Sequence, residues 1–344
     1  MTTVEDTNSL ISVPFPHRVN PRIDDGRQMA LDWCRACGIT EDTDVTWRRY
    51  READPERIIG YCYPDAHGED HRLAVDMMCQ FVATDDAFES TFWQDPGAGV
   101  GYLEAVSEVL HARTPVAPRP SHAPLVRMFI PMWERSCRGM SPAWREHAAR
   151  SWLDYFWGYL SEATSTDLPM RDYLELRRTV VGTSPCFDML ERAHHYELPE
   201  RFRTHVLYRR LREAATDLVT LCNDVASVRK DQARDDASNA VLLLARARHL
   251  DVADARLRVV EMIHDRARDH HSSRQDVDRV CDLLYIEGKE RAHCHRWARE
   301  VLEWVGGNLR WQGQIARYYG KARAVLPDAA HLAVLTGCPI GRGA

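Results

Sequence analysis

Apolar residues recur along almost the whole of this sequence with a spacing close to the 3.6-residue period of an α-helix. Runs of β-branched residues with alternating polarity, which are typical of strands, are scarce. Hydrophobic residues make up 44% of the 344 positions, which is enough to bury a large core. We therefore predict an all-α fold, a bundle of roughly a dozen helices in a single domain.

Helix-breaking residues suggest where this domain begins and ends. Pro14 and Pro16 indicate an extended N-terminal segment over residues 1–22. The helical domain is expected over residues 23–322, and residues 323–344 are expected to form a C-terminal tail.

Breakers and periodicity together predict the individual helices. The polar stretch from Asp265 to Asp276 is expected to be a surface turn between two of them. Helices are expected over residues 24–37, 71–92, 100–112, 123–138, 142–163, 169–181, 184–194, 199–231, 236–248, 252–271, 274–305 and 308–322.

Charge and composition exclude several classes of function. The net charge is −6 with a pI near 6.2. The sequence has no basic patch that would bind a nucleic-acid backbone, so we expect no nucleic-acid partner. The sequence lacks a run of roughly 18 apolar residues and an N-terminal signal peptide, so we expect a cytoplasmic protein without membrane contact. Ten cysteines lie mostly alone within helical patterns, which indicates reduced thiols.

An acidic cluster interrupts an apolar helical pattern at Asp85, Asp86 and Glu89. In a helix, Asp85 and Glu89 share a face, whereas Asp86 is rotated by ~100° from Asp85. Phe81 lies one turn before Asp85 on the same face. Read on its own, the cluster is either a solvated acidic patch at a helix end or one half of a metal site.

A second oxygen-rich stripe lies far downstream. Asn223, Ser227 and Asp231 recur every four residues and so occupy one face of a helix. Amide, hydroxyl and carboxylate oxygens are hard ligands that suit Mg²⁺. Lys230 returns to nearly the same face and offers a cation to an anionic ligand. This spacing also arises by chance, so its position one turn after an apolar run strengthens the hypothesis.

The two stripes resemble the aspartate-rich motif and the second metal motif of class I terpene synthases. Two further matches follow in the order that this family requires. Arg178 resembles the arginine that senses the diphosphate, and Gly182 stands at the effector position on a helix break. Arg317 and Tyr318 resemble the C-terminal pair that contacts the diphosphate. The resemblance covers nearly the whole chain and is strongest to bacterial cyclases of the single-domain type.

Two positions depart from the family pattern. Asp231 stands where the family usually has Glu, so a shorter carboxylate must serve the second motif. Val181 occupies a linker position that is often Asp, which removes a polar tether between Arg178 and Gly182.

The resemblance implies a central apolar cavity and a reaction. A prenyl diphosphate, which we expect to be farnesyl diphosphate, would lose diphosphate and cyclise to a sesquiterpene hydrocarbon or alcohol. It also implies three Mg²⁺ ions, and a homodimer is a common arrangement in such proteins. Phe81 and Trp311 are the expected aromatic walls of the substrate pocket. The implied metal ligands are Asp85, Asp86, Glu89, Asn223, Ser227 and Asp231, and the diphosphate-side residues are Arg178, Gly182, Lys230, Arg317 and Tyr318.

Three alternative functions stay open from the sequence. A diterpene synthase would use geranylgeranyl diphosphate with the same motifs. A chain-elongating prenyltransferase would need a second aspartate-rich motif, and the pair Asp235 and Asp236 lacks its final acid. A non-catalytic helical binding protein would be expected to have lost metal ligands, and these are nearly intact.

Overall fold

The computed structural model describes residues 11, 15–37, 54–88, 92, 95–165, 168–233 and 238–314. Within these ranges the chain forms fourteen helices and no strand, which confirms the predicted all-α fold. The helices are α2 (Asp25–Ala36), α4 (Pro55–Cys62), α5 (Gly68–Ala87), α6 (Pro96–His111), α7 (Pro124–Cys137), α8 (Pro142–Thr164), α9 (Met170–Val180), α10 (Thr183–Ala193), α11 (Glu200–Arg203), α12 (Val206–Ala233), α13 (Ala240–Arg248), α14 (Val252–Gln275), α15 (Val277–Leu283) and α16 (Gly288–Gln312).

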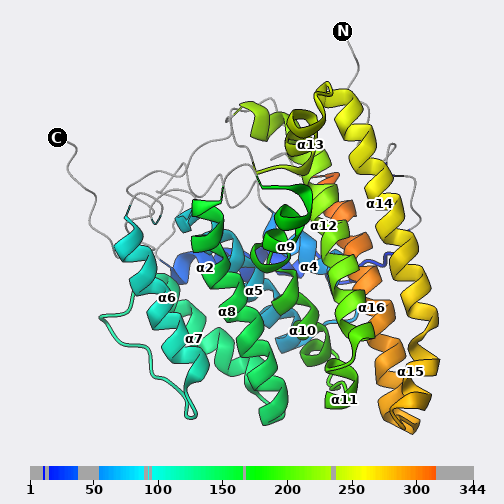
Figure 1. Ribbon diagram of the computed structural model, residues 1–344. Coiled ribbons are helices and arrows are strands. Elements are labelled where there is room, and N and C mark those ends of the chain that lie inside the picture. Colours follow the sequence, from blue (N-terminus) through cyan, green and yellow to red (C-terminus); the bar gives the residue numbers. More distant parts are fainter. Residues whose placement is uncertain are drawn as a thin grey trace, which may run out of the picture.

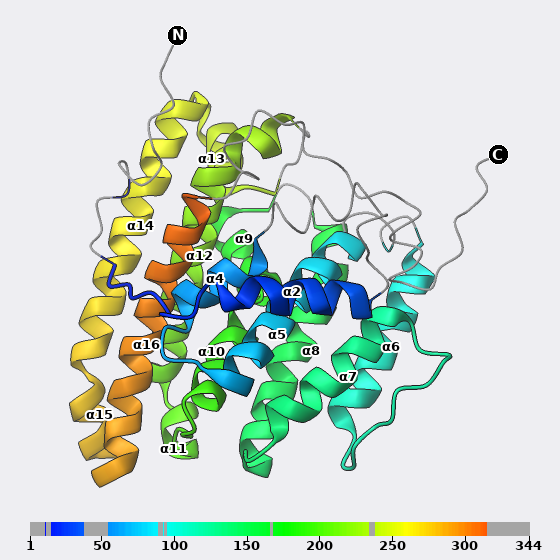
Figure 2. The same ribbon diagram turned by 180° about the vertical axis from the view of Figure 1, so that it is seen from behind.

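The helices form two groups joined through the middle of the molecule. Helices α6, α7 and α8 lie on one side, and α12, α14 and α16 lie on the other (Figure 1). Helix α2 crosses the back of the molecule and packs on α5 (Figure 2). The short helices α9 and α10 each contact both α8 and α12, so the break between them lies where the two groups meet.

The last described helix runs through a pair of glycines where the sequence pattern predicted a break. A Cβ atom on Gly306 would lie 2.2 Å from the carbonyl oxygen of Pro16, and one on Gly307 would lie 2.4 Å from that of Tyr61. The glycines therefore allow α16 to approach the N-terminal segment and α4 closely. The predicted helices 274–305 and 308–322 are corrected to α15 and α16 over the described residues.

The expected surface turn from Asp265 to Asp276 is also wrong. Helix α14 continues to Gln275, and His270 within that stretch is fully buried. The polar residues belong to the outer face of a helix whose inner face packs on α12. The predicted helix 252–271 is therefore extended to Gln275, with Asp276 alone forming the turn before α15.

Two smaller differences concern the number of helices. The predicted helix 199–231 is divided into α11 and α12 at Thr204 and His205. Helix α4 was not expected, although Pro55 at its first position is a common start signal. The tail predicted over residues 323–344 lies outside the described residues, so the proposed domain limits stay a prediction.

No helix in the described part of the chain combines the length and apolar character needed to cross a membrane. Nine of the cysteines lie in that part, and all nine are free thiols.

Candidate active site

The first acidic stripe lies at the C-terminal end of α5. Asp86 is buried, whereas Asp85 is half-buried. The Tyr159 hydroxyl donates a hydrogen bond to Asp85 Oδ1 at 3.1 Å, and Tyr155 Oη lies 2.9 Å from Tyr159 Oη. Burial raises the pKa of both tyrosines well above the ordinary value, so they act as neutral donors that orient Asp85. Glu89 lies outside the described residues.

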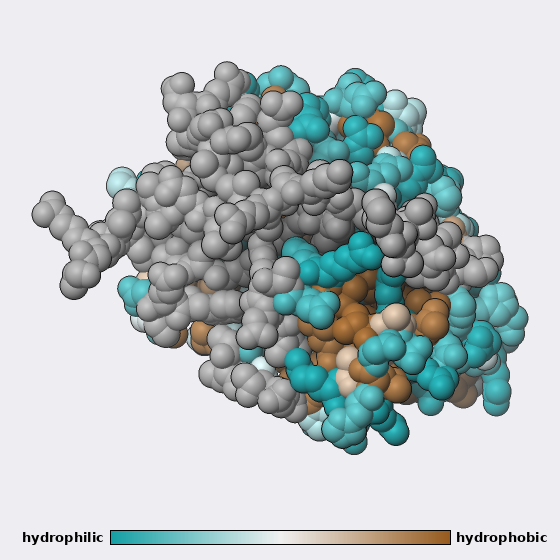
Figure 3. All heavy atoms as spheres, turned by 90° about the horizontal axis from the view of Figure 1, so that it is seen from above, coloured by the Kyte–Doolittle hydropathy of each residue, from teal (hydrophilic) through white to brown (hydrophobic). Residues whose placement is uncertain are grey.

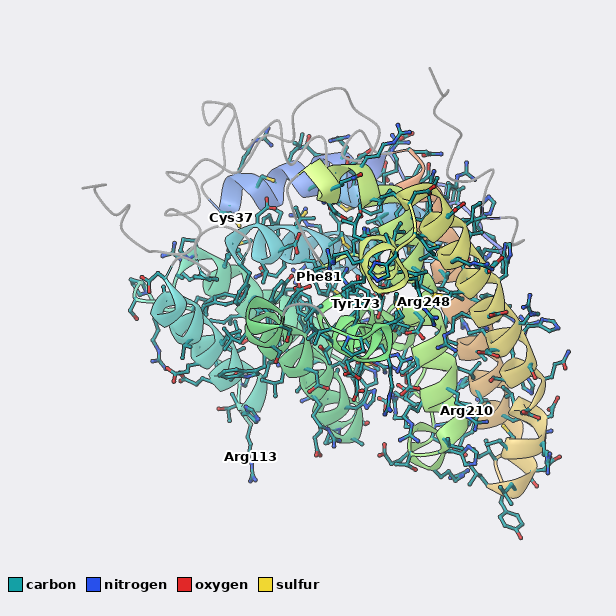
Figure 4. The ribbon with its side chains drawn as sticks, turned by 45° about the horizontal axis from the view of Figure 1, so that its top comes forward. Cys37, Phe81, Arg113, Tyr173, Arg210 and Arg248 are labelled. Atoms are coloured by element: carbon teal, nitrogen blue, oxygen red, sulfur yellow. The ribbon has the colours of Figure 1, made fainter. Side chains whose placement is uncertain are left out.

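Aromatic rings form the wall below Asp85. Phe81 stacks on Trp152 with ring centroids 4.8 Å apart, and it meets the edge of Tyr155 at the same separation. Phe81 and Tyr173 both lie among the helices in the interior, whereas the labelled side chains of Arg113 and Arg210 point outward (Figure 4). Phe81 therefore lies where the sequence placed it, one turn below the acidic end of α5.

The aromatic face of α8 was missed in the sequence. Trp152, Tyr155, Phe156 and Tyr159 are all buried and follow the i, i+3, i+4, i+7 spacing of one helical face. This spacing was the signal that could have found them. The same pattern also describes ordinary core packing, so only the contacts with Phe81 and Asp85 give these rings a place in the site.

The second stripe lies in the last turns of α12, and its oxygen atoms are already gathered. The Ser227 hydroxyl donates to Asp231, and Asn239 Nδ2 donates to Asp231 Oδ2 at 2.9 Å. Lys230 Nζ lies 3.4 Å from Asp231 Oδ1. Asn223 is half-buried one turn before Ser227. The aspartate that replaces the expected glutamate is thus held by a hydroxyl, an amide and a cation.

Asp224 lies beside this stripe, but its carboxylate binds neighbouring helices instead. Its carboxylate accepts hydrogen bonds from the Tyr173 hydroxyl at 2.7 Å and from the backbone N–H of Ala240 at 2.9 Å. Burial raises the pKa of Asp224 to about 6, although the nearby guanidinium of Arg177 opposes the shift. The residue therefore joins α12 to α9 and to the start of α13.

The break between α9 and α10 occurs at Gly182, whose φ of 74° lies in the left-handed region that favours glycine. A Cβ atom there would lie 2.9 Å from Phe81. On the other side of the break, Thr183 Oγ1 lies 2.8 Å from Thr216 Oγ1 of α12. The break therefore links the aromatic wall of α5 to α12.

The two arginines before this break point to different partners. Arg178 donates from Nε and Nη2 to the two carboxylate oxygens of Asp217, both at 2.8 Å. Arg177 donates to Glu162 of α8 at 3.1 Å. The arginine expected to bind diphosphate is thus held by a buried carboxylate of α12 in this structure, and no sequence motif indicated that partner.

The remaining predicted residues are less directly placed. Trp311 is half-buried and its indole N–H donates to the carbonyl oxygen of Asp54, which precedes α4, at 3.3 Å. Arg317 and Tyr318 lie outside the described residues. The roles assigned to these three residues stay predictions.

The candidate metal-ligand atoms of the two stripes suit a hard divalent cation. They are carboxylate, hydroxyl and amide oxygens, with no thiolate or imidazole among them, and Ser227, Asp231 and Asn239 are held within hydrogen-bond distance of one another. Among the described residues, no cluster of three or more His, Cys, Asp or Glu side chains could hold a metal by itself.

The upper surface of the molecule has a hollow in which hydrophobic residues are visible, bordered by hydrophilic ones (Figure 3). This combination suits a ligand with an apolar body and a charged end.

The amino-acid sequence matches a family model described as terpene synthase family 2, C-terminal metal binding, over residues 76–269. A (−)-β-caryophyllene synthase of Saccharothrix espanaensis, described as cyclising (2E,6E)-farnesyl diphosphate, is 35% identical over 89% of this chain and 87% of its own length. A pentalenene synthase of Streptomyces avermitilis is 31% identical over 89% of this chain and 91% of its own.

Solved structures show the same architecture. The crystal structure of germacradien-4-ol synthase from Streptomyces citricolor superposes with a TM-score of 0.78, at 26% identity, over 90% of this chain and 99% of that one. Together with the family match and the curated relatives, this similarity extends over nearly the full length of the chain. The protein therefore belongs to the bacterial class I terpene synthases.

Proposed function

We propose that this protein is a Mg²⁺-dependent sesquiterpene cyclase that converts farnesyl diphosphate to a cyclic hydrocarbon or alcohol and releases diphosphate. The observation that carries the proposal is the 35% identity, over most of both chains, to a synthase described as cyclising (2E,6E)-farnesyl diphosphate. The arrangement of oxygen ligands above an aromatic wall supports it from the structure.

We assign the metal ligands to Asp85, Asp86 and Glu89 on one side and to Asn223, Ser227 and Asp231 on the other. Bound Mg²⁺, three ions in this proposal, would supply the positive charge that stabilises the departing diphosphate. The residues of the chain do the rest. Tyr159 orients Asp85, and Asn239 orients Asp231, so that both carboxylates are set before the substrate enters.

The diphosphate side of the site is assigned to Arg178, Lys230, Arg317 and Tyr318. The departure of diphosphate leaves an allylic cation, which water would quench. Phe81 and the rings of α8 exclude water below Asp85 and present ring faces that stabilise positive charge. Gly182 allows the backbone of the α9–α10 break to pack against Phe81, so any shift at that break would be felt by the wall of the pocket.

The test is incubation of the purified protein with MgCl₂ and, separately, geranyl, farnesyl and geranylgeranyl diphosphate, followed by analysis of the volatile products. We expect a cyclic C15 product from farnesyl diphosphate. The D85N variant and a sample with EDTA serve as controls, and both should lose the product. Cyclic products from the C20 substrate alone would transfer the assignment to a diterpene synthase.

The C10 substrate belongs in this assay because of one neighbour. A linalool/nerolidol synthase from Streptomyces clavuligerus, 27% identical with a TM-score of 0.78, was solved in complex with 2-fluorogeranyl diphosphate. Longer prenyl diphosphates among the products would instead indicate a chain-elongating prenyltransferase. The absence of turnover with all three substrates would support a non-catalytic binding protein.

A further inference from the structure

Arg178 is held by a carboxylate that has a second guanidinium partner. Asp217 lies on α12 and is only 2% exposed, whereas Arg178 is 29% exposed. Arg266 of α14 directs its Nε to Asp217 Oδ2 at 2.8 Å, the same oxygen atom that accepts from Arg178 Nη2. Three helices, α9, α12 and α14, therefore meet at one buried carboxylate.

The geometry limits what Arg178 can do while it is bound there. Its Nε and Nη2 form the edge of the guanidinium that would otherwise grip a diphosphate through two parallel hydrogen bonds. To use that edge on a diphosphate, Arg178 must leave Asp217. Removing the only partner of a buried charge is strongly unfavourable, because the remaining charge is left without compensation.

Arg266 removes this obstacle. It comes from a different helix and keeps its own contact with Asp217 when the Arg178 side chain turns away. Of the two arginines before Gly182, Arg178 has the more exposed side chain, so it has more room to turn than Arg177. Arg178 can therefore leave Asp217 while Arg266 still neutralises this buried carboxylate.

We propose that Asp217 and Arg266 are positioning residues for Arg178: Asp217 holds its guanidinium in the ligand-free enzyme, and Arg266 neutralises Asp217 when Arg178 moves to the diphosphate. This inference rests on the proposed function, because it takes diphosphate as the ligand of Arg178. It adds two residues and one helix, α14, to the machinery that the sequence motifs indicate.

The test is the binding of inorganic diphosphate to the full-length protein in MgCl₂, measured by calorimetry. We expect R266M to raise the Kd by about tenfold or more, because Arg178 then leaves an uncompensated carboxylate behind. The matched control is R268M, which removes the same charge from an exposed site on the same helix, paired with Asp265 rather than Asp217. R268M should leave the Kd within about twofold of the wild-type value.

The carboxylate variant predicts the opposite direction. In D217N, Arg178 leaves no buried charge behind, so the Kd should equal or fall below the wild-type value. In the double variant D217N/R266M, the loss caused by R266M should be recovered. A merely structural ion cluster would make the double variant bind worse than either single one, and that result would overturn the proposal. Equal effects of R266M and R268M would overturn it as well.

Two further measurements separate the failure of this inference from the failure of the proposed function. R178M in the same assay shows whether Arg178 binds diphosphate at all, and product formation by the wild-type enzyme tests the cyclase assignment. Thermal unfolding of each variant without ligand shows whether it is folded. If R266M does not fold, the single variant D217N decides, because only the proposed role predicts undiminished binding for it.

Discussion

Buried carboxylates lie at the two ends of α12 in opposite surroundings. Near its start, Arg212 donates to Asp188 of α10 at 2.7 Å, and His147 of α8 lies 3.1 Å from the same carboxylate. The guanidinium of Arg212 holds the pKa of Asp188 well below its ordinary value despite complete burial, and the contact with His147 adds to the shift. Near the other end, Asp224 is bound by a hydroxyl and a backbone amide, and burial raises its pKa to about 6.

The same contrast holds between Asp188, whose charge serves the fold, and Asp231 beside Asp224, whose charge we propose to serve a ligand. At the start of α12 the positive partner is covalently part of the chain, so the ion pair is complete when the protein folds. At the end of α12, Asp231 is held by Ser227 and Asn239 with one lysine nearby. Oxygen ligands held mostly by neutral donors can be set in position and still gain energy from an added cation. The predictions below test this division.

The largest effect is expected on stability, from the Arg212→Met substitution at the start of α12. Asp188 would lose its principal partner while it stays buried, which typically costs about 3–5 kcal/mol of unfolding free energy. Urea unfolding measures the loss. The affinity of the folded fraction for Mg²⁺ and diphosphate should be unchanged, because the substitution lies in the other end of the helix.

Arg209→Met is the matched control for this prediction. Arg209 lies on the same helix, but its side chain is exposed and its contact with Glu213 is long, at 4.0 Å. An exposed pair of this kind contributes at most about 1 kcal/mol. Equal losses from R209M and R212M would show that the buried pair has no special role.

At the other end of α12, Asn223→Ala should reduce turnover with little change in stability. Loss of one ligand removes part of the charge stabilisation of the leaving group, which we expect to lower kcat by about a hundredfold or more. Asp85→Asn should do the same. Circular dichroism and the urea midpoint should match those of the wild-type protein. Full activity in either variant would remove that residue from the ligand set.

A third prediction concerns His270 of α14, which is fully buried beside α12. Both of its ring nitrogens lack a hydrogen-bond partner among the described residues, and burial lowers its pKa to about 4, with Arg274 adding to the shift. The unfolded state therefore binds a proton first as the pH falls through 6.5. The contribution of His270 to the free energy of unfolding is therefore fully present above pH 6.5 and is lost progressively toward pH 4. At pH 5 the free energy of unfolding is lower by about 2 kcal/mol.

His270→Leu should remove this part of the acid sensitivity. The midpoint of urea unfolding at pH 7.5 and at pH 5 gives the difference for each protein. The matched control is His271→Leu, which removes the exposed histidine next to it and should keep most of the wild-type pH dependence, because His271 is the smallest of the three causes of the shift. Identical slopes for the H270L variant and the wild-type protein would show that His270 is protonated equally well in the folded state.

The sequence predicted the helical fold and the position of the acidic stripes because both depend on spacing along one chain. Helical periodicity located most of the helices, and the break at Gly182 was expected from its motif. The pattern failed where a tertiary contact decides the outcome. Gly306 and Gly307 do not end a helix because α16 needs their small size to approach its neighbours.

The same reason explains which parts of the site were missed. Asp217 is an ordinary acidic residue in sequence, and only the packing of α9 and α14 on α12 brings two arginines to it. Tyr159 lies 74 residues from Asp85, so no local pattern could reveal their hydrogen bond. Motifs predict ligands, whereas the residues that orient the ligands depend on which helices become neighbours.

The smallest effect in this series concerns one of those orienting residues, through the Tyr159→Phe substitution. The change removes the hydrogen bond to Asp85 but keeps the ring, which stacks on Phe88 with centroids 4.4 Å apart. Substitutions of residues that orient metal ligands typically weaken metal affinity by about 10–100-fold, and we expect the lower end because Asp85 is only half-buried. Titration of Mn²⁺ in the presence of diphosphate measures this affinity without turnover.

Tyr102→Phe is the appropriate control for Tyr159→Phe. Tyr102 is also a buried tyrosine of the aromatic cluster, but its hydroxyl contacts Thr84 at 3.2 Å and Gln80 at 3.4 Å rather than Asp85. If Tyr159 only fills space, Y159F and Y102F should affect stability alone and leave the metal affinity unchanged. A selective loss of Mn²⁺ affinity in Y159F would instead show that a neutral donor sets the carboxylate in place before the cation arrives, as the contrast between the two ends of α12 requires.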